Sequence, residues 1–150
     1  MRVMVIVKAN KDSEAGVMPK QKLLEDMGKF NEELVKAGVM LAGEGLQPSS
    51  KGKRVKFSGD KRIVRDGPFT EAKELVAGFW IWRVASMDEA VEWVTRMPNP
   101  MPDEAPEVEI RPVFSADDFA ESDPTGEMRE AESRLRQQVA GQQQGGSSRQ

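Results

Sequence analysis

The sequence predicts an α+β fold in which a four-stranded antiparallel sheet is covered on one face by two helices. Three observations predict it: short apolar segments typical of strands, two amphipathic segments typical of helices, and the order in which these segments alternate. The 150 residues favour a single main domain that can bury a core without disulfides.

The N-terminal segments give the first strand and the first helix. Residues 2–8 are rich in β-branched side chains, which favours a buried strand, and the polar stretch 11–17 is expected to be a loop. A helix follows, with Pro19 as an early residue and Gly38 as its C-terminal cap. Its apolar face consists of Leu23, Leu24, Met27, Phe30, Leu34 and Val35.

The middle of the chain is expected to contain a strand, a loop and a β-hairpin. Residues 39–42 read as a short strand, and the Gly- and Ser-rich stretch 43–50 is expected to be a loop. Residues 54–58 and 62–65 flank a Gly-Asp pair, a turn signal, so we expect them to form an inserted hairpin.

The next segments complete the sheet. Residues 75–85 are the longest strand candidate, and Ser86 and Glu89 have the spacing of a capping box at the start of a second helix. Residues 108–112 alternate apolar and charged side chains, as in a final strand with one polar face. Without the hairpin the order is βαββαβ, the ferredoxin-like arrangement of two split βαβ units.

The strand at 75–85 is apolar on both sides, and this predicts a dimer. Phe79 and Ile81 point to one side, and Trp80 and Trp82 point to the other. Two helices cover one face only, so we expect the tryptophans on the open face, where a monomer rarely tolerates a large apolar patch. A second copy packed sheet to sheet would cover them and leave a cavity. The alternative is that the hairpin or the C-terminal helix covers this side.

An extension follows the domain at 1–115. Residues 116–141 are expected to be a helical extension, with Asp123 as N-cap and Pro124 as the first helical residue, and the polar residues 142–150 a disordered tail. Acidic and basic residues are equal in number within the domain, so the net charge of −3 arises in the extension.

The absence of cysteine, histidine and tyrosine excludes several kinds of chemistry. Disulfides, thiolate nucleophiles, cysteine-zinc sites and an imidazole base are all impossible, and neither a metal nor a cofactor is expected. The balanced charge of the domain makes nucleic acid an unlikely partner. No apolar stretch approaches the roughly 20 residues of a membrane span, and no signal peptide is recognisable, so we expect a cytoplasmic protein.

Carboxylates and a lysine are the candidate catalytic residues. Glu44 stands between two glycines after an apolar strand, as a carboxylate aimed into a pocket or as part of a plain turn. Asp66 either lies at the mouth of the cavity or holds a turn in which Gly67 has an unusual φ and Phe69 fills the core. Glu71 and Lys73 share one side of an extended segment, either for proton transfer or as an exposed ion pair.

The candidate ligand-binding residues besides Glu71 are two tryptophans and an arginine. Trp80 and Trp82 could stack on a planar ligand or serve as core anchors. Arg111 could clamp a carboxylate or phosphate, or pair with Glu109. A basic stretch could bind phosphate groups or an acidic partner, or simply be solvated; it contains Lys51, Lys53, Arg54, Lys56, Lys61, Arg62 and Arg65.

Four motifs carry a family resemblance: Gly-Glu-Gly-Leu-Gln-Pro at 43–48, Asp-Gly-Pro-Phe-Thr-Glu-Ala-Lys-Glu at 66–74, Gly-Phe-Trp at 78–80 and Glu-Val-Glu-Ile-Arg-Pro at 107–112. Together they resemble the DGPF family of YCII-related proteins over about residues 1–114. The resemblance implies a ferredoxin-like protomer in a dimeric α/β barrel. It also implies a regulatory role, since some members look like genetic neighbours of sigma factors. A histidine-aspartate pair of some relatives cannot be transferred, because this chain has no histidine.

Three functional hypotheses follow. The first is a homodimeric small-molecule binding or regulatory module, its pocket lined by Glu44, Asp66, Trp80, Trp82 and Arg111. The second is a cofactor-independent acid/base enzyme, a lyase, isomerase or hydrolase, with Glu44 or Asp66 as base and Lys73 or Arg111 steadying the developing anion. The third is a protein partner in transcription regulation that acts through the basic hairpin or the acidic tail.

Overall fold

A computed structural model describes residues 1–145, and of Lys73 it describes the backbone only. The chain divides into two compact units, Met1–Val113 and a second unit that begins at Phe114. None of the helices within residues 1–145 has the length and apolar character needed to cross a membrane.

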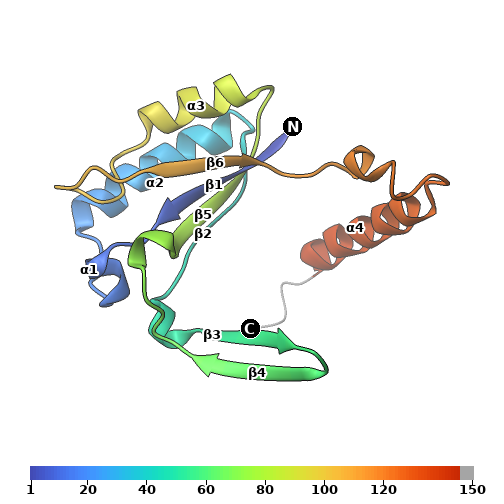
Figure 1. Cartoon of the computed structure of the whole chain (residues 1–150). Helices are drawn as coiled ribbons and strands as arrows, with labels where there is room; N and C mark the ends of the chain where they lie inside the picture. Colours follow the sequence, from blue (N-terminus) through green and yellow to red (C-terminus); the bar gives the residue numbers. More distant parts are fainter. Residues whose placement is uncertain (146–150) are drawn as a thin grey trace. The chain divides into compact units, whose positions relative to one another are not determined.

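The first unit is built on a four-stranded antiparallel sheet. Its strands lie in the order β2-β5-β1-β6, and their bounds are β1 Arg2–Lys8, β2 Met40–Gly45, β5 Val76–Arg83 and β6 Val108–Pro112. The helices α2 (Gln21–Lys36) and α3 (Met87–Arg96) lie together on one side of this sheet (Figure 1). The predicted α+β class is confirmed, and without the hairpin the order is βαββαβ, consistent with the ferredoxin-like pattern.

The hydrophobic core lies between the sheet and its two helices. The ring of Phe30, from α2, makes edge contacts with Trp80, Trp82 and Trp93 at centroid distances of 6.2 to 6.3 Å. The other buried members are Val3, Val5, Val7, Leu34, Val39, Val84 and Ala90. Burying aromatic surface in this way is the main stabilising contribution of such a core.

The expected position of the tryptophans is wrong. Trp80 and Trp82 lie on the face of β5 that the helices cover, and Trp82 has no exposed surface. Phe79 and Ile81 lie on the open face instead. Because both sides of β5 are apolar, the periodicity of this strand alone does not indicate which side faces the helices. The larger indole side chains lie on the side that the helices bury.

Two segments that were expected to be loops contain regular structure. Residues 11–17 include a short helix, α1 (Lys11–Glu14), which Asn10 caps by accepting a 2.8 Å hydrogen bond from the backbone N–H of Ser13. Strand β2 continues to Gly45 because β5 pairs with it over this length, so Glu44 belongs to the sheet and not to a loop.

The ends of α2 only partly match the prediction. Pro19 precedes the helix, which begins at Gln21, whereas Gly38 follows its C-terminus with a φ of +70°, as expected for a terminating glycine. Leu24 and Val35, expected on the apolar face, are exposed.

The predicted hairpin is confirmed as a separate two-stranded sheet. Strands β3 (Lys53–Ser58) and β4 (Lys61–Asp66) pair only with each other, and every residue in them is exposed. Short 3₁₀ helices precede and follow the hairpin, η1 at Ser49–Lys51 and η2 at Ala72–Glu74. The hairpin extends away from α2 and α3 (Figure 1).

The second unit contains η3 (Ala116–Phe119) and α4 (Glu127–Gly145). The expected first helical residue, Pro124, precedes α4, because a loop at 124–126 separates Asp123 from the helix. Residues 142–145 are helical, so the predicted tail begins too early; the rest of that tail lies outside the described residues.

Candidate functional site

The sheet face away from the helices has an apolar centre. Strands β1 and β5 place Met4 opposite Ile81, and Ile6 opposite Phe79. All four side chains are half-buried in the single chain. We call these four residues the floor.

Charged residues line both edges of the floor. On the β2 edge Glu44 lies opposite Phe79, and on the β6 edge Arg111 lies opposite Met4 and Glu109 opposite Ile6. Facing residues of an antiparallel pair share a face, so these groups all point to the open side. The floor is therefore bounded by a carboxylate on one edge and by a guanidinium on the other.

The expected pairing of Arg111 with Glu109 is present but loose. Arg111 Nε lies 3.8 Å from Glu109 Oε2, and Lys8 Nζ lies 3.7 Å from Glu109 Oε1. The Arg111 side chain is 72% exposed, and an ion pair of this kind contributes at most about 1 kcal/mol. The guanidinium therefore keeps most of its donors available for an anion.

Glu44 owes its place in the sheet to the glycine before it. A Cβ at Gly43 would lie 2.7 Å from Cδ1 of Trp80, so only glycine lets β2 cross this indole. At Gly78, on β5, a Cβ would lie 3.1 Å from the backbone oxygen of Glu44. These close approaches fix the backbone that carries the carboxylate.

Asp66 lies at the base of the hairpin and not on the floor. It ends β4 opposite Lys53, and the two side chains form an exposed ion pair. Gly67 does not have the unusual φ that was expected. It is required instead by close approach, since a Cβ there would lie 1.8 Å from the backbone oxygen of Ser49.

Phe69 holds the hairpin base rather than filling the core. Its backbone N–H donates to Ser49 Oγ at 3.0 Å, and its half-buried ring stacks under Arg54 at 4.0 Å and Arg65 at 5.5 Å. Ser49 in turn donates to the carboxylate of Glu14, from its N–H at 3.0 Å and its Oγ at 2.5 Å. The run at 66–69 therefore fixes the direction in which the hairpin leaves the sheet.

The remaining predicted site residues lie elsewhere. Glu71 has a φ of +65° and precedes η2, which contains the backbone of Lys73, so the extended segment that would align these two residues does not form. Trp80 Nε1 donates to Asn31 Oδ1 at 3.0 Å within the core. Trp82, fully buried, has no surface in the single chain that could contact a ligand.

Of the predicted set, the structure places Glu44 and Arg111 on the open face of the sheet, at its opposite edges, and Trp80 and Trp82 next to each other in the core. The floor itself was missed, although β1 carried a signal for it: Val3, Val5 and Val7 alternate with Met4 and Ile6 along this strand. Within residues 1–145, no three acidic side chains lie close enough together to hold a metal ion.

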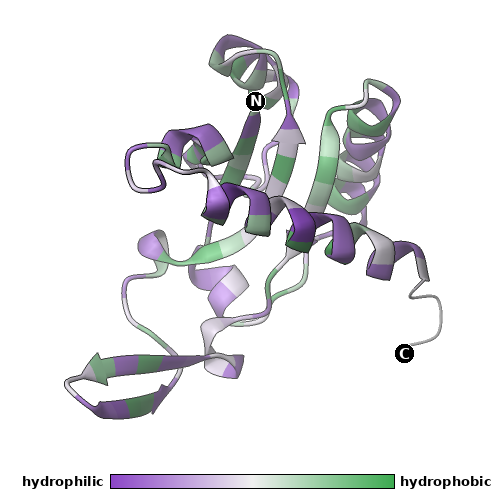
Figure 2. Cartoon of the chain, turned by 90° about the vertical axis from the view of Figure 1, so that its right-hand side faces the viewer, coloured by the Kyte–Doolittle hydropathy of each residue, from purple (hydrophilic) through white to green (hydrophobic). Residues whose placement is uncertain are grey.

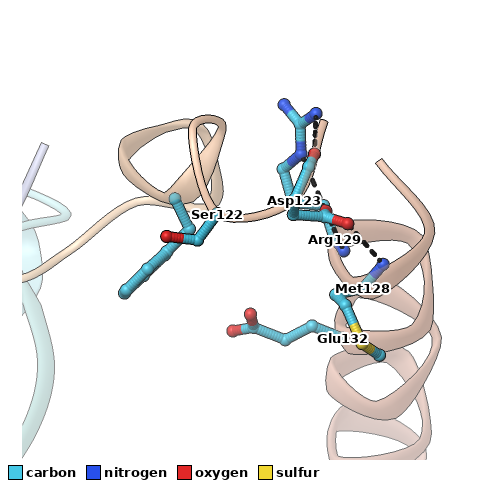
Figure 3. A pocket seen from close by; sticks show the side chains of 6 residues that line it. Ser122, Asp123, Met128, Arg129 and Glu132 are labelled. Carbon is cyan, nitrogen blue, oxygen red and sulfur yellow. Dashed lines mark hydrogen bonds and ion pairs between the residues drawn. The ribbon is translucent and has the colours of Figure 1, made fainter. Parts of the chain in front are cut away.

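The second unit has an open hollow, shown in Figure 3. Its central group is the buried carboxylate of Asp123, which accepts hydrogen bonds from the backbone N–H groups of Met128 and Arg129 at 3.1 and 3.0 Å and from Arg129 Nε at 3.2 Å. The backbone bond from Arg129 lowers the pKa of this carboxyl below its usual value, against the opposing effect of burial. Asp123 therefore caps the N-terminus of α4.

Comparisons with known proteins place residues 1–116 in a recognised group. This range matches the model of the YCII-related domain family. An uncharacterized protein of Rhizobium meliloti (strain 1021) is 30% identical over 93 residues, which are 62% of this chain and 74% of that protein. A solved structure, 5-chloro-2-hydroxyhydroquinone dehydrochlorinase (TftG) from Burkholderia phenoliruptrix AC1100 in complex with 2,5-dihydroxybenzoquinone, is 16% identical, with a TM-score of 0.37 over 77% of this chain and 96% of that one.

Proposed function

The chain belongs to the YCII-related domain family, and on that premise we propose that it is a homodimer that binds a small molecule between the open faces of two sheets. The observation that carries this proposal is the floor, an apolar surface bounded by Glu44 on one edge and Arg111 on the other.

The need to cover the floor supports the dimer. Stable domains bury apolar faces between two layers, and the helices of the first unit, α2 and α3, cover one side of its sheet (Figure 1). Met4, Ile6, Phe79 and Ile81 would lie against the same residues of a second copy. The interface differs from the one expected from the sequence, because Phe79 and Ile81 replace Trp80 and Trp82.

The chemistry of the edges indicates the class of ligand. A flat apolar body fits the floor, an anionic group fits the exposed guanidinium of Arg111, and a hydrogen-bond donor fits the carboxylate of Glu44. A carboxylate can also accept a proton, so acid/base chemistry on such a ligand would use the same site, with Glu44 as the base.

The assembly is tested with a charge placed on the floor. We expect the full-length chain to have the mass of a dimer by light scattering and Phe79→Asp to be a monomer, because two carboxylates would be buried in each interface. Val91→Asp, on the half-exposed outer side of α3, is the matched control and should remain a dimer. A wild-type monomer at all concentrations would contradict the proposal.

Ligand binding is tested with the probe 1-anilinonaphthalene-8-sulfonate, which combines flat apolar rings with one sulfonate. Arg111→Gln should weaken its affinity by about tenfold or more, because a charge-assisted contact is lost. Arg134→Gln removes an exposed arginine of α4 and should change nothing. Equal affinities of Arg111→Gln and the wild type would exclude Arg111 from the site.

A further inference from the structure

We propose that the β3–β4 hairpin is an assembly arm that packs one of its faces against a second copy of this chain. This inference rests on the sheet-to-sheet dimer proposed above and adds a second contact surface to it. The surface, which we call the apolar hairpin face, consists of Val55, Phe57 and Val64, whose side chains are 51%, 72% and 60% exposed.

The pairing of the hairpin strands separates two faces of different chemistry. Val55 lies opposite Val64, and Phe57 lies opposite Arg62, whose guanidinium stacks on the Phe57 ring at 4.2 Å. The other face carries four cations and one apolar residue: Arg54, Lys56, Lys61, Ile63 and Arg65. Hydrophilic and hydrophobic residues alternate along β3 from Val55 on, whereas β4 has two adjacent apolar residues, one on each face. Figure 2 shows both kinds of residue along the hairpin.

The basic face is suited to water and not to a protein interface. Arg54 and Arg65 are directly opposite each other and share the ring of Phe69, and within residues 1–145 none of the four cations has an acidic partner. Burying several unpaired charges is costly, whereas apolar side chains gain from burial. The apolar hairpin face is therefore the one that a partner would cover.

The hairpin is held in a fixed direction without being packed. An isolated two-stranded hairpin is marginally stable at best, and here no residue of either strand is buried. Its base, however, is fixed by the Gly67 N–H bond to Gly52 O at 3.1 Å, by Phe69 bonded to Ser49, and by Ser49 bonded to Glu14. A rigid base under an unpacked ribbon is what a docking arm requires.

The size of the sheet face favours a second copy as the partner. Four strands about 4.8 Å apart, with five to eight residues of about 3.4 Å each, have a flat area of roughly 400 Å². A standard stable interface buries about 800 Å² of accessible surface on each partner, so contact through the sheet alone would make a small interface. The hairpin leaves the sheet between β2 and β5, next to Glu44 and Phe79, and could supply the missing area beside the same interface.

Sedimentation of the full-length chain over a range of concentrations tests the arm. We expect Val55→Thr/Val64→Thr, which keeps the shape and strand preference of both residues, to weaken the dimer by about tenfold or more, because two buried apolar contacts become polar. Ile63→Thr changes a neighbour of similar exposure, 49%, on the basic face and should leave the dissociation constant within about twofold. Near-ultraviolet circular dichroism of the buried tryptophans checks that both variants fold.

The other outcomes separate the arm from the sheet-to-sheet dimer. An unchanged dissociation constant in Val55→Thr/Val64→Thr overturns the arm, while loss of the dimer in Phe79→Asp keeps the sheet interface. Weakening by the hairpin variant with no effect of Phe79→Asp supports the arm and overturns the sheet interface. Equal weakening by Ile63→Thr would show that hairpin stability and not the apolar hairpin face is responsible, and a monomeric wild type overturns both proposals.

Discussion

At Gly43, strand β2 passes directly over the indole of Trp80. Adding a single methyl group at this position, as in Gly43→Ala, tests how closely the two pack. A Cβ there would lie 2.7 Å from Trp80 Cδ1 and 2.8 Å from Met40 Cε. The thioether end can move, but the buried ring cannot, so we expect Gly43→Ala to lower the free energy of unfolding by about 1 to 3 kcal/mol.

Gly45 is the matched control for this change, since it lies two residues further along the same strand and a Cβ there meets nothing within 4 Å. Gly45→Ala should be neutral or slightly stabilising, because alanine restricts the unfolded chain. Denaturant unfolding compares the two variants, and equal stabilities would show that β2 does not press on Trp80 as described.

The sheet face to which each strand side chain points was the feature of the site that the sequence predicted least well. Glu44 was identified by the glycines on either side of it, and Arg111 by its place on the polar face of the last strand; both do lie on the open face. Trp80 and Trp82 were placed on the wrong side because β5 is apolar on both faces. The deciding information lies on other strands, in the buried valines of β1 and in Gly43, and becomes usable only when the pairing register is known.

Among the elements, α4 depends on a cap that lies outside the helix. Asp123 precedes the first helical residue, Glu127, by four positions, and a loop through Gly126, with a φ of +77°, returns its carboxylate to the N–H groups of Met128 and Arg129. The charge also favours the positive end of the helix dipole. The sequence correctly identified Asp123 as the cap but assumed the usual spacing.

The cap makes the start of α4 sensitive to acid. Hydrogen bonds to the charged form lower the folded-state pKa of Asp123 below its unfolded value, near 3.9. Its contribution to stability is therefore complete above that value and is lost as the pH falls through the folded-state pKa. The amide resonances of Met128 and Arg129 should titrate together with a midpoint below about 3.9 and cease to do so in Asp123→Asn. A midpoint at or above the usual value would contradict the structure.

Elements with strong local signals were predicted well. The first strand matches its predicted bounds, and both hairpin strands begin and end within one residue of theirs. Ser86 caps α3, because its Oγ accepts a hydrogen bond from the N–H of Glu89 at 3.2 Å. The extension of β2 through Gly43 and Gly45 was missed, because glycine-rich sequence resembles a loop and only pairing with β5 makes it a strand.

For the whole molecule, the charges on the floor's edges select one way of pairing two sheets. A two-fold axis parallel to the strands places the β2 edge of one copy over the β6 edge of the other. Glu44 then lies level with Glu109 of the second copy, which Lys8 and Arg111 already pair with, and about 7 Å along the strand from Arg111 of that copy. An axis perpendicular to the strands would place the two β2 edges over each other, so that two edges carrying Glu44 meet, an arrangement that like charges oppose. In one sheet the two edges are three strand spacings apart, about 14 Å, so the first arrangement makes each binding site from both copies.

Mixing two defective variants tests whether the site is shared. Glu44→Gln and Arg111→Gln should each bind 1-anilinonaphthalene-8-sulfonate weakly when alone, because every site lacks one charged group. If each site combines Glu44 of one copy with Arg111 of the other, subunit exchange creates mixed dimers in which one site has both native residues and the other has neither. An equimolar mixture should then recover about a quarter of the wild-type sites at wild-type affinity. If both residues of a site came from the same copy, every site in every mixed dimer would still carry one defect, and mixing would restore nothing.

A Glu44→Gln/Arg111→Gln chain mixed with the wild type controls for subunit exchange. If the site is shared, no site in a mixed dimer has both native residues, so exchange halves the number of high-affinity sites in the mixture. If the site lies within one copy, exchange leaves that number unchanged.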